Sequence, residues 1–284
     1  CVRRWSTPVG TSTRTLVLAL ATALMWGGVG EVWAQEEEEG EVEGEGEVEV
    51  EVVGVRSKGG ATEEVVRREE IESFPHQDAE DLLRMSPGMH LSAHGGRGKA
   101  YQIFVRGFDA VHGSDVAVSL EGIPLNEASH IHGQGYVDLH FIPPEAVLEL
   151  DLAKGAARAD QGDYAIAASA DYRVGLAEPG LRTGIGAGTD RSLRGVAAFR
   201  PDGKGEDNFL VGDVEWSEGA GQQRGHRAVR AMGGVGGDWG AAHLRWFAGA
   251  YSGWFESPGV LREDDLESGA IEFQEPVGNA ERGQ

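Results

Sequence analysis

The stretch from Asp78 to Gly155 constrains the fold more than any other part of the chain, because it combines a helix signal with strands separated by glycine corners. Asp78 is placed to cap a short helix, and Pro87-Gly88 ends it, since proline disfavours helical backbone at the preceding residue. Gly-, Pro- and Asn-rich turns then separate three strand-like runs, which are Tyr101–Val105, Val116–Leu120 and Val147–Leu152. The stretch therefore predicts a small domain of mixed helix and strand.

Four landmarks occur in order within this stretch, namely LLRMSPG from Leu82, VRG from Val105, LEGIPLN from Leu120 and LAKG from Leu152. Together they resemble the plug domain of TonB-dependent outer-membrane receptors. The resemblance implies an α+β plug domain over residues 63–175, followed by an antiparallel transmembrane β-barrel of which residues 176–284 supply only the first strands. It also implies structural roles in the plug for six residues, Arg106, Gly107, Gly122, Pro124, Asn126 and Gly155. Because a buried guanidinium is costly alone, we expect Arg106 to have a carboxylate or carbonyl partner.

The first 34 residues read as a signal peptide. Arg3, Arg4 and Arg14 precede an apolar run from Leu16 to Met25, and small residues precede Gln35. The run is shorter than the ~20 residues that a membrane-spanning helix needs. The single cysteine, Cys1, lies in or before this region, so no disulfide is expected in the exported chain.

Residues 35–62 form an acidic linker that contains one strand signal. Valines alternate with glutamates from Glu47 onward, and a period of two is typical of a strand that can pair with the edge of another sheet. By resemblance, Glu47–Val55 is the candidate TonB box, the strand that pairs with the TonB protein and its inner-membrane energising complex. The pairing residues would be Val48, Val50, Val52 and Val53.

Short alternating runs follow from about Leu181. In Leu210–Trp216, for example, one face carries Leu210, Gly212, Val214 and Trp216, and the other carries Val211, Asp213 and Glu215. Such runs suit either a soluble sandwich or a membrane barrel, and tryptophans near strand ends together with the export signal favour the barrel. At ~10 residues per strand the run supplies six to eight strands, fewer than the ~22 that enclose a plug, so we expect an incomplete barrel.

Several function classes are disfavoured. A formal net charge of −22 argues against a nucleic-acid partner, because phosphate contacts need clustered Lys and Arg. Gly95–Lys99 resembles a phosphate loop, but Ala100 stands where a Walker loop needs Ser or Thr. No nucleophile or acid–base pair is spaced for catalysis, so we expect no enzyme and no cofactor. His130 and His132 could share a strand face and bind a metal, or serve as hydrogen-bonding loop residues; the absence of a nearby Cys favours the second interpretation.

The resemblance further implies import of a scarce solute across the outer membrane of a Gram-negative bacterium, with lipid around the barrel and the N-terminal segment in the periplasm. An iron–siderophore complex is the expected cargo among small-molecule and metal-chelate ligands. An exported β-rich domain for ligand binding or adhesion, without transport, is the alternative. By motif position, two apical loops, His90–Lys99 and Asn126–Tyr136, carry the candidate substrate contacts, which are His94, Arg97, Asn126, His130, His132, Gln134 and Tyr136.

Overall fold

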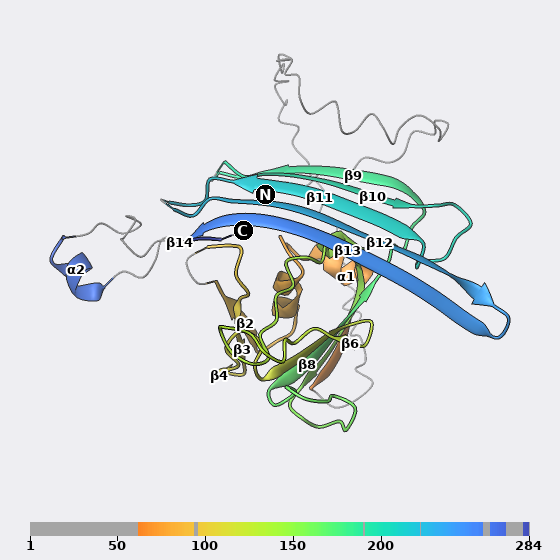
Figure 1. The fold of residues 1–284 in the computed structure, drawn as a ribbon, viewed down its shortest axis with the longest axis horizontal. Coiled ribbons are helices and arrows are strands. Elements are labelled where there is room, and N and C mark those ends of the chain that lie inside the picture. Colours follow the sequence, from red (N-terminus) through yellow and green to blue (C-terminus); the bar gives the residue numbers. More distant parts are fainter. Residues whose placement is uncertain are drawn as a thin grey trace, which may run out of the picture. The chain divides into compact units, whose positions relative to one another are not determined.

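The computed structural model describes residues 62–93, 96–189, 191–221, 223–257, 262–270 and 281–283 (Figure 1). The predicted signal peptide, the acidic linker up to residue 61 and the predicted TonB box lie outside these residues. So does His94, one of the predicted substrate contacts. In the described part of the chain, no helix combines the length and the apolar character needed to cross a bilayer.

A mixed five-stranded sheet is the centre of the N-terminal domain, which we define as residues 62–176. Its order is β1-β7-β8-β5-β6, so β1 lies at one edge. Strands β1, β7 and β8 pair antiparallel, whereas β5 and β8 pair parallel although they are far apart in sequence. Their bounds are β1 Glu63–Arg67, β5 Val116–Leu120, β6 Ile123–Pro124, β7 Val147–Lys154 and β8 Ala168–Val174. The strands predicted at Val116–Leu120 and Val147–Leu152 are therefore confirmed.

Short helices and a small second sheet complete this domain. The elements are α1 (Arg68–Ser73), the 3₁₀ helices η2 (Glu80–Met85) and η3 (Pro144–Ala146), and the strands β2 (Met89–Ser92), β3 (Gln102–Val105) and β4 (Phe108–Asp109). The N-cap residue of η2 is Ala79, one position after the predicted Asp78, but Oδ1 of Asp78 still accepts a hydrogen bond from the backbone N–H of Asp81 in the first turn over 3.0 Å. Leu82 and Leu83 of η2 are fully buried, and Ser86 is extended ahead of Pro87.

Two hairpins in this domain turn through residues with left-handed backbone. Arg106 and Gly107 have φ of 52° and 83°, and Glu121 and Gly122 have φ of 54° and 74°. Both hairpins thus close through two residues, β3 to β4 and β5 to β6, as a type I′ turn requires. The expectation of a buried, partnered Arg106 side chain was wrong. Because the residue occupies a turn corner, its side chain is exposed, while its backbone N–H donates to the carbonyl of Gly88 over 2.7 Å.

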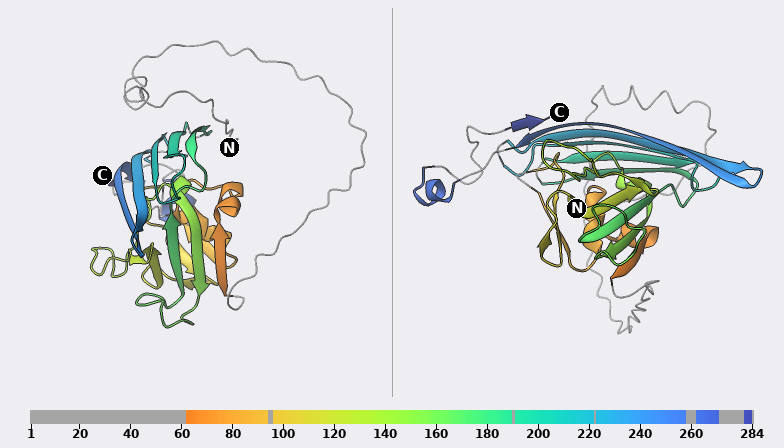
Figure 2. Two further views of the ribbon diagram at one scale, coloured as in Figure 1. Left: turned by 90° about the vertical axis from the view of Figure 1, so that its right-hand side faces the viewer. Right: turned by 60° about the horizontal axis from the view of Figure 1, so that its bottom comes forward.

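The C-terminal part of the described chain forms one six-stranded sheet in the order β14-β13-β12-β11-β10-β9, in which all neighbours are antiparallel (Figures 1 and 2). The strands lengthen from β9 to β13. Their bounds are β9 Gly180–Ala187, β10 Leu193–Arg200, β11 Phe209–Ser217, β12 His226–Trp239, β13 Ala242–Ser257 and β14 Glu281–Gly283. A further helix, α2 (Glu263–Glu267), follows β13.

The six-stranded sheet buries charged residues on one face and exposes apolar residues on the other, the reverse of the arrangement in a water-soluble protein. On its inner face Asp213, Glu215 and Arg230 are buried. The opposite face is apolar and exposed, through residues that include Leu210, Val214, Trp216, Val229, Val235, Trp239, Leu244 and Trp246. A membrane barrel shows this distribution because its outer face meets lipid, whereas a soluble sandwich would bury the apolar face. The structure thus favours the barrel alternative.

One hydrophobic core joins the two parts. Phe209, Val211 and Met232 of the six-stranded sheet belong to the same buried cluster as Ile142 and Leu150 of the N-terminal domain. The apolar part of the sheet's inner face therefore packs on the N-terminal domain. The charged part of that face lies beside it and makes the contacts described next.

Candidate functional site

A run of buried ion pairs crosses the contact between the N-terminal domain and the six-stranded sheet. Glu145, on η3, accepts two hydrogen bonds from Arg194 of β10, from Nη1 to Oε1 over 2.7 Å and from Nη2 to Oε2 over 2.8 Å. Arg194 Nη2 also donates to Asp213 Oδ2 of β11 over 2.7 Å. The bidentate geometry of the Glu145–Arg194 pair is the strongest that arginine and a carboxylate form.

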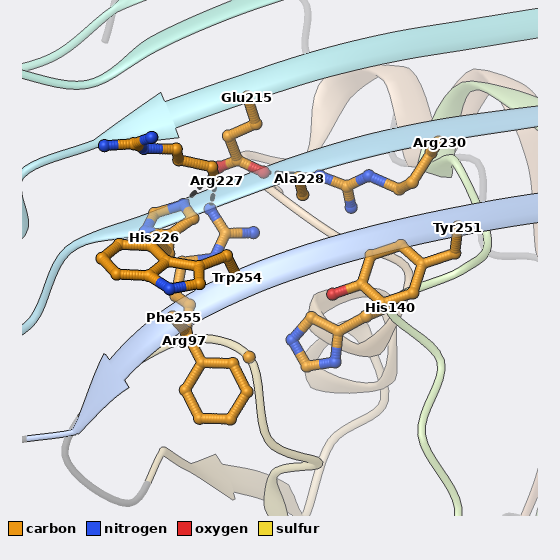
Figure 3. Close-up of a pocket in the computed structure, with 11 residues that line it drawn as sticks. Arg97, His140, Glu215, His226, Arg227, Ala228, Arg230, Tyr251, Trp254 and Phe255 are labelled. Atoms are coloured by element: carbon orange, nitrogen blue, oxygen red, sulfur yellow. Dashed lines mark hydrogen bonds and ion pairs between the residues drawn. The ribbon is translucent and has the colours of Figure 1, made fainter. Parts of the chain in front are cut away.

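The run continues across the sheet and returns to the N-terminal domain. Arg230 of β12 donates to Asp213 over 2.9 Å and to Glu215 over 2.5 Å. Glu215 also accepts from Arg97 (Figure 3). The Nη2 of Arg97 donates to Asp78 over 3.0 Å. We call the whole set the interdomain ion-pair chain; in order, it is Glu145–Arg194–Asp213–Arg230–Glu215–Arg97–Asp78.

Signs alternate along the chain, so each interior charge has an opposite charge on both sides. Burial alone would raise the pKa of Glu145, but the hydrogen bonds and positive charge of Arg194 lower it to about 2. Burial would likewise raise the pKa of Asp78, but Arg97, His140 and the hydrogen bond from Tyr101 lower it. Both end carboxylates therefore stay ionised. Removing one charge would leave a neighbouring buried charge without full compensation. The interdomain ion-pair chain therefore stabilises the contact only when all of its members are present.

Beside Asp78 lies a second polar group, Glu80, Asp138 and His140. Among the described residues, these three form the group whose potential metal-binding atoms lie within 4.8 Å of one another. The two oxygens of Glu80 accept the backbone N–H groups of Tyr101 and Leu139, each over 3.1 Å. Burial raises the pKa of Glu80 to about 8. Glu80 thus connects η2 to the residue before β3 and to the segment before η3.

His140 completes this group through Asp138. Its Nδ1 lies 2.7 Å from Asp138 Oδ1, and its backbone N–H donates to the same oxygen over 2.8 Å. Burial would lower the pKa of His140, but the hydrogen bond to Asp138 and the nearby carboxylates of Glu80 and Asp78 raise it to about 9. Within the described residues, Nε2 of His140 has no hydrogen-bond partner.

A small cavity lies between these two groups. Its lining includes Arg97, His140, Glu215, Arg230 and Tyr251, and Figure 3 shows the His140 imidazole beside the Tyr251 phenol. The cavity measures about 10 Å³. That is the size of roughly one water molecule by the same measure, so no substrate fits here.

Two of the predicted substrate contacts are held inside the structure. Arg97 belongs to the interdomain ion-pair chain, with a side chain that is 15% exposed. The side-chain oxygen of Asn126 accepts from the backbone N–H of Val118 over 2.7 Å, and its amide nitrogen donates to three backbone carbonyls over 2.9–3.0 Å. Those carbonyls belong to Gly113, Val116 and Gly135. Both side chains thus make interactions that stabilise the domain itself.

The remaining described candidates are on one loop. Gln134 is exposed, and the rings of His130 and Tyr136 stack with centroids 4.0 Å apart. The rings of His132 and His112 meet edge to face at 4.5 Å, and both lie within 6 Å of the Tyr136 ring. We call His112, His130, His132 and Tyr136 the imidazole cluster. Sequence reasoning missed His112, because its separation from the loop follows no motif spacing.

Two predicted structural positions complete the picture. Pro124 lies in the edge strand β6, where its missing N–H costs no sheet hydrogen bond. Gly155 follows β7 with a φ of 88°, and its N–H donates to the carbonyl of Ala167 over 2.7 Å. Such a φ favours glycine, so this residue type fits the turn after β7.

Comparison with known proteins agrees with this architecture. Residues 56–169 match the family described as the TonB-dependent receptor plug domain. A vitamin B12 transporter, BtuB of Vibrio vulnificus (strain CMCP6), is 28% identical over 162 residues, which are 56% of this chain and 25% of that protein. The chain therefore spans about a quarter of the length of this relative.

Solved structures show the same fold. The copper transporter OprC superposes with a TM-score of 0.53 at 18% identity, covering 72% of this chain and 32% of that one. The ferric citrate transporter FecA, in the unliganded form, superposes with a TM-score of 0.56 at 16% identity, covering 72% of this chain and 33% of that one. The names of these proteins are those of transporters and not of enzymes.

A mixed α+β domain fastened to the charged inner face of an antiparallel sheet with an apolar outer face defines a plugged β-barrel. The N-terminal domain is the plug, and the six-stranded sheet is part of the barrel wall. Residues 56–169 thus match the TonB-dependent receptor plug domain, and the plug with the adjoining sheet has the fold seen in the solved transporters.

Proposed function

We propose that the intact protein imports a scarce solute across the outer membrane of a Gram-negative bacterium with energy delivered by TonB. The observation that carries the proposal is the interdomain ion-pair chain, which fastens the plug to the inner face of the wall. A fastened plug blocks the barrel until work is done on it. The expected cargo is an iron–siderophore complex, a proposal supported by the ferric citrate transporter among the structural neighbours.

We infer a path for the applied force, which the topology supports. We propose that TonB, in the periplasm, pairs with Glu47–Val55 through Val48, Val50, Val52 and Val53, and that its pull reaches β1. Among the described strands, β1 is an edge strand that pairs with β7 alone, through five residue pairs, so its separation breaks no other strand pair there.

Arg68, immediately after β1, connects the pulled strand to the fastening. Its Nη1 donates to the carbonyls of Pro144 and Val147, over 3.2 and 3.1 Å, on either side of Glu145. Displacing β1 would therefore disturb η3 and the Glu145–Arg194 pair first. The plug would then shift between a blocked and an open state, a population change driven from outside.

Deletion of Glu47–Val55 from the intact receptor tests this proposal. Binding of the cargo to cells should persist while energy-dependent uptake stops, because the deletion leaves the ligand-facing surface unchanged and removes the strand that TonB would bind. A deletion of equal length within the acidic linker, Glu36–Gly44, is the matched control and should leave uptake in place. Uptake that continues after the first deletion would refute the assignment of the TonB-pairing strand.

A further inference from the structure

Lys154, the last residue of β7, is a buried lysine whose ammonium group is fully hydrogen-bonded. Its side chain is 3% exposed. Nζ donates to Glu64 Oε1 over 2.7 Å, to Ser86 Oγ over 2.8 Å and to the carbonyl oxygen of Pro87 over 3.1 Å. A lysine ammonium has three protons to donate, so these acceptors use all of them. Lys154 thus connects β7 to β1 and to the turn that follows η2.

Glu64 supplies the negative charge in this arrangement. Ser86 and Pro87 contribute a hydroxyl and a carbonyl, which are neutral, so among the described contacts of Lys154 only Glu64 compensates its charge. A buried charge that loses its partner is strongly destabilised. Glu64 itself is 28% exposed, and water can solvate its carboxylate when the pair is broken. Breaking the pair therefore leaves the uncompensated charge on Lys154.

The Glu64–Lys154 pair lies where a pull on the N-terminal segment would arrive first. Glu64 is the second residue of β1, and the backbone N–H of Lys154 donates to the carbonyl of Thr62, the residue before β1, over 2.8 Å. Lys154 thus holds the start of β1 through both its backbone and its side chain. When β1 is peeled from its N-terminal end, these two contacts break before the later residue pairs between β1 and β7.

The pair also connects β1 to the interdomain ion-pair chain. Ser86 is 1% exposed and is the C-cap residue of η2, a helix that begins two residues after Asp78. At the other end of β1, Arg68 contacts the carbonyls that flank Glu145. Asp78 and Glu145 are the two end carboxylates of the interdomain ion-pair chain. Both ends of β1 are therefore in contact with the segments that carry these carboxylates.

We propose that the Glu64–Lys154 pair is a latch that sets the force at which β1 leaves the plug. While Glu64 is in place, the charge of Lys154 is compensated and the end of η2 is held against β7. When β1 is pulled away, the ammonium remains buried without its counter-ion, and the turn at Ser86 must open to admit water. The action of the latch under TonB rests on the proposed import function, whereas its effect on the stability of β1 does not.

Hydrogen–deuterium exchange of the intact receptor in detergent, without cargo or TonB, tests the latch. Glu64→Gln leaves Lys154 buried without a counter-ion, so the backbone amides of β1 should exchange about tenfold faster or more, whereas those of β5 should not change. Glu63→Gln is the matched control, because it makes the same charge change on the opposite face of β1. Exchange in that variant should equal that of the unsubstituted receptor.

A double substitution separates charge compensation from packing. Glu64→Gln combined with Lys154→Met removes the buried cation together with its partner, so exchange of β1 should return to within about threefold of the unsubstituted rate. A double variant that exchanges as fast as Glu64→Gln alone would overturn the proposal. So would unchanged exchange in Glu64→Gln, equal acceleration in Glu63→Gln, or acceleration of β5 that matches that of β1.

Single-molecule pulling on the N-terminal segment of the intact receptor measures the latch under force. The first rupture should occur at a lower force in Glu64→Gln than in Glu63→Gln, and equal forces would contradict the proposal. Uptake assays separate the latch from the import function. Faster exchange in Glu64→Gln, with uptake that survives deletion of Glu47–Val55, refutes the proposed import mechanism alone. Unchanged exchange and rupture force, with uptake that stops on that deletion, refute the latch alone.

Discussion

Glu145 and Arg194 form a bidentate ion pair, with hydrogen bonds of 2.7 and 2.8 Å, between the last short helix of the plug and the second strand of the wall. Their side chains are 3% and 14% exposed. Arg194 also reaches Asp213, so one guanidinium neutralises two buried carboxylates. Arg194 is therefore the residue at which the attachment of the plug to the wall is most easily tested.

Arg194→Met should destabilise the plugged receptor by about 3–5 kcal/mol, because the buried Glu145 loses its bidentate partner and the buried Asp213 loses one of its two arginines. The measurement is the free energy of unfolding in detergent, from urea titration. Arg191→Met is the matched control, since Arg191 pairs with Glu218 at the surface, where side chains are 75% and 49% exposed. That change should cost less than about 1 kcal/mol. Equal effects of the two substitutions would contradict the fastening role.

The stability of the receptor should fall in acid in a way that depends on Glu145. The pKa of Glu145 is lowered from 4.5 to about 2 in the fold. Its contribution is therefore present above pH 4.5 and is lost as the pH falls through about 2. The contribution is on the order of 3 kcal/mol. Glu145→Gln should be less stable than the unsubstituted receptor at pH 6, and the difference should shrink toward pH 2; a constant difference would contradict the prediction.

Gly98 should be far less tolerant of alanine than Gly107. Both have left-handed backbone, with φ of 99° and 83°. A Cβ on Gly98 would lie 2.4 Å from Cγ of Phe255 on β13, whereas a Cβ on Gly107 meets nothing within 4 Å. Gly107→Ala should cost about 1–2 kcal/mol for the backbone alone. Gly98→Ala should cost roughly 1–3 kcal/mol more, because the added Cβ overlaps Phe255 and displaces the neighbouring Arg97–Glu215 pair. The unfolding midpoints of the two variants in detergent measure this difference.

Asn126→Ala should destabilise the plug by about 3 kcal/mol, because buried backbone groups lose their partners. Gln134→Ala, at an exposed position of the same loop, should change stability by less than about 0.5 kcal/mol. Thermal unfolding of both variants, compared with their ligand affinity, separates the two roles. An Asn126→Ala receptor with unchanged stability and weakened ligand binding would support the substrate-contact prediction instead.

Much of the plug could be predicted from local sequence. The strand Val116–Leu120 has the predicted bounds, and Asp78 accepts a hydrogen bond from the first turn of η2, although the N-cap residue is Ala79. These features depend on residues a few positions apart, whose spacing and type are visible in the sequence. The predicted helix is a 3₁₀ helix, and Arg106 is at an exposed corner and not in a buried pair. The local sequence pattern locates a turn, but it does not show which side chains of the turn the rest of the fold buries.

The sequence by itself determined the order of elements, the two glycine corners and the alternation of apolar and charged residues on strands such as Leu210–Trp216. Only the tertiary structure decided that Glu145 meets Arg194, that Asp78 is connected to Glu215 through Arg97, and that His112 lies against His132. The reason is physical: backbone periodicity is set by neighbouring residues, whereas an ion pair or ring contact acts over a few ångströms in space. Partners that are distant in sequence become recognisable only after the chain has folded.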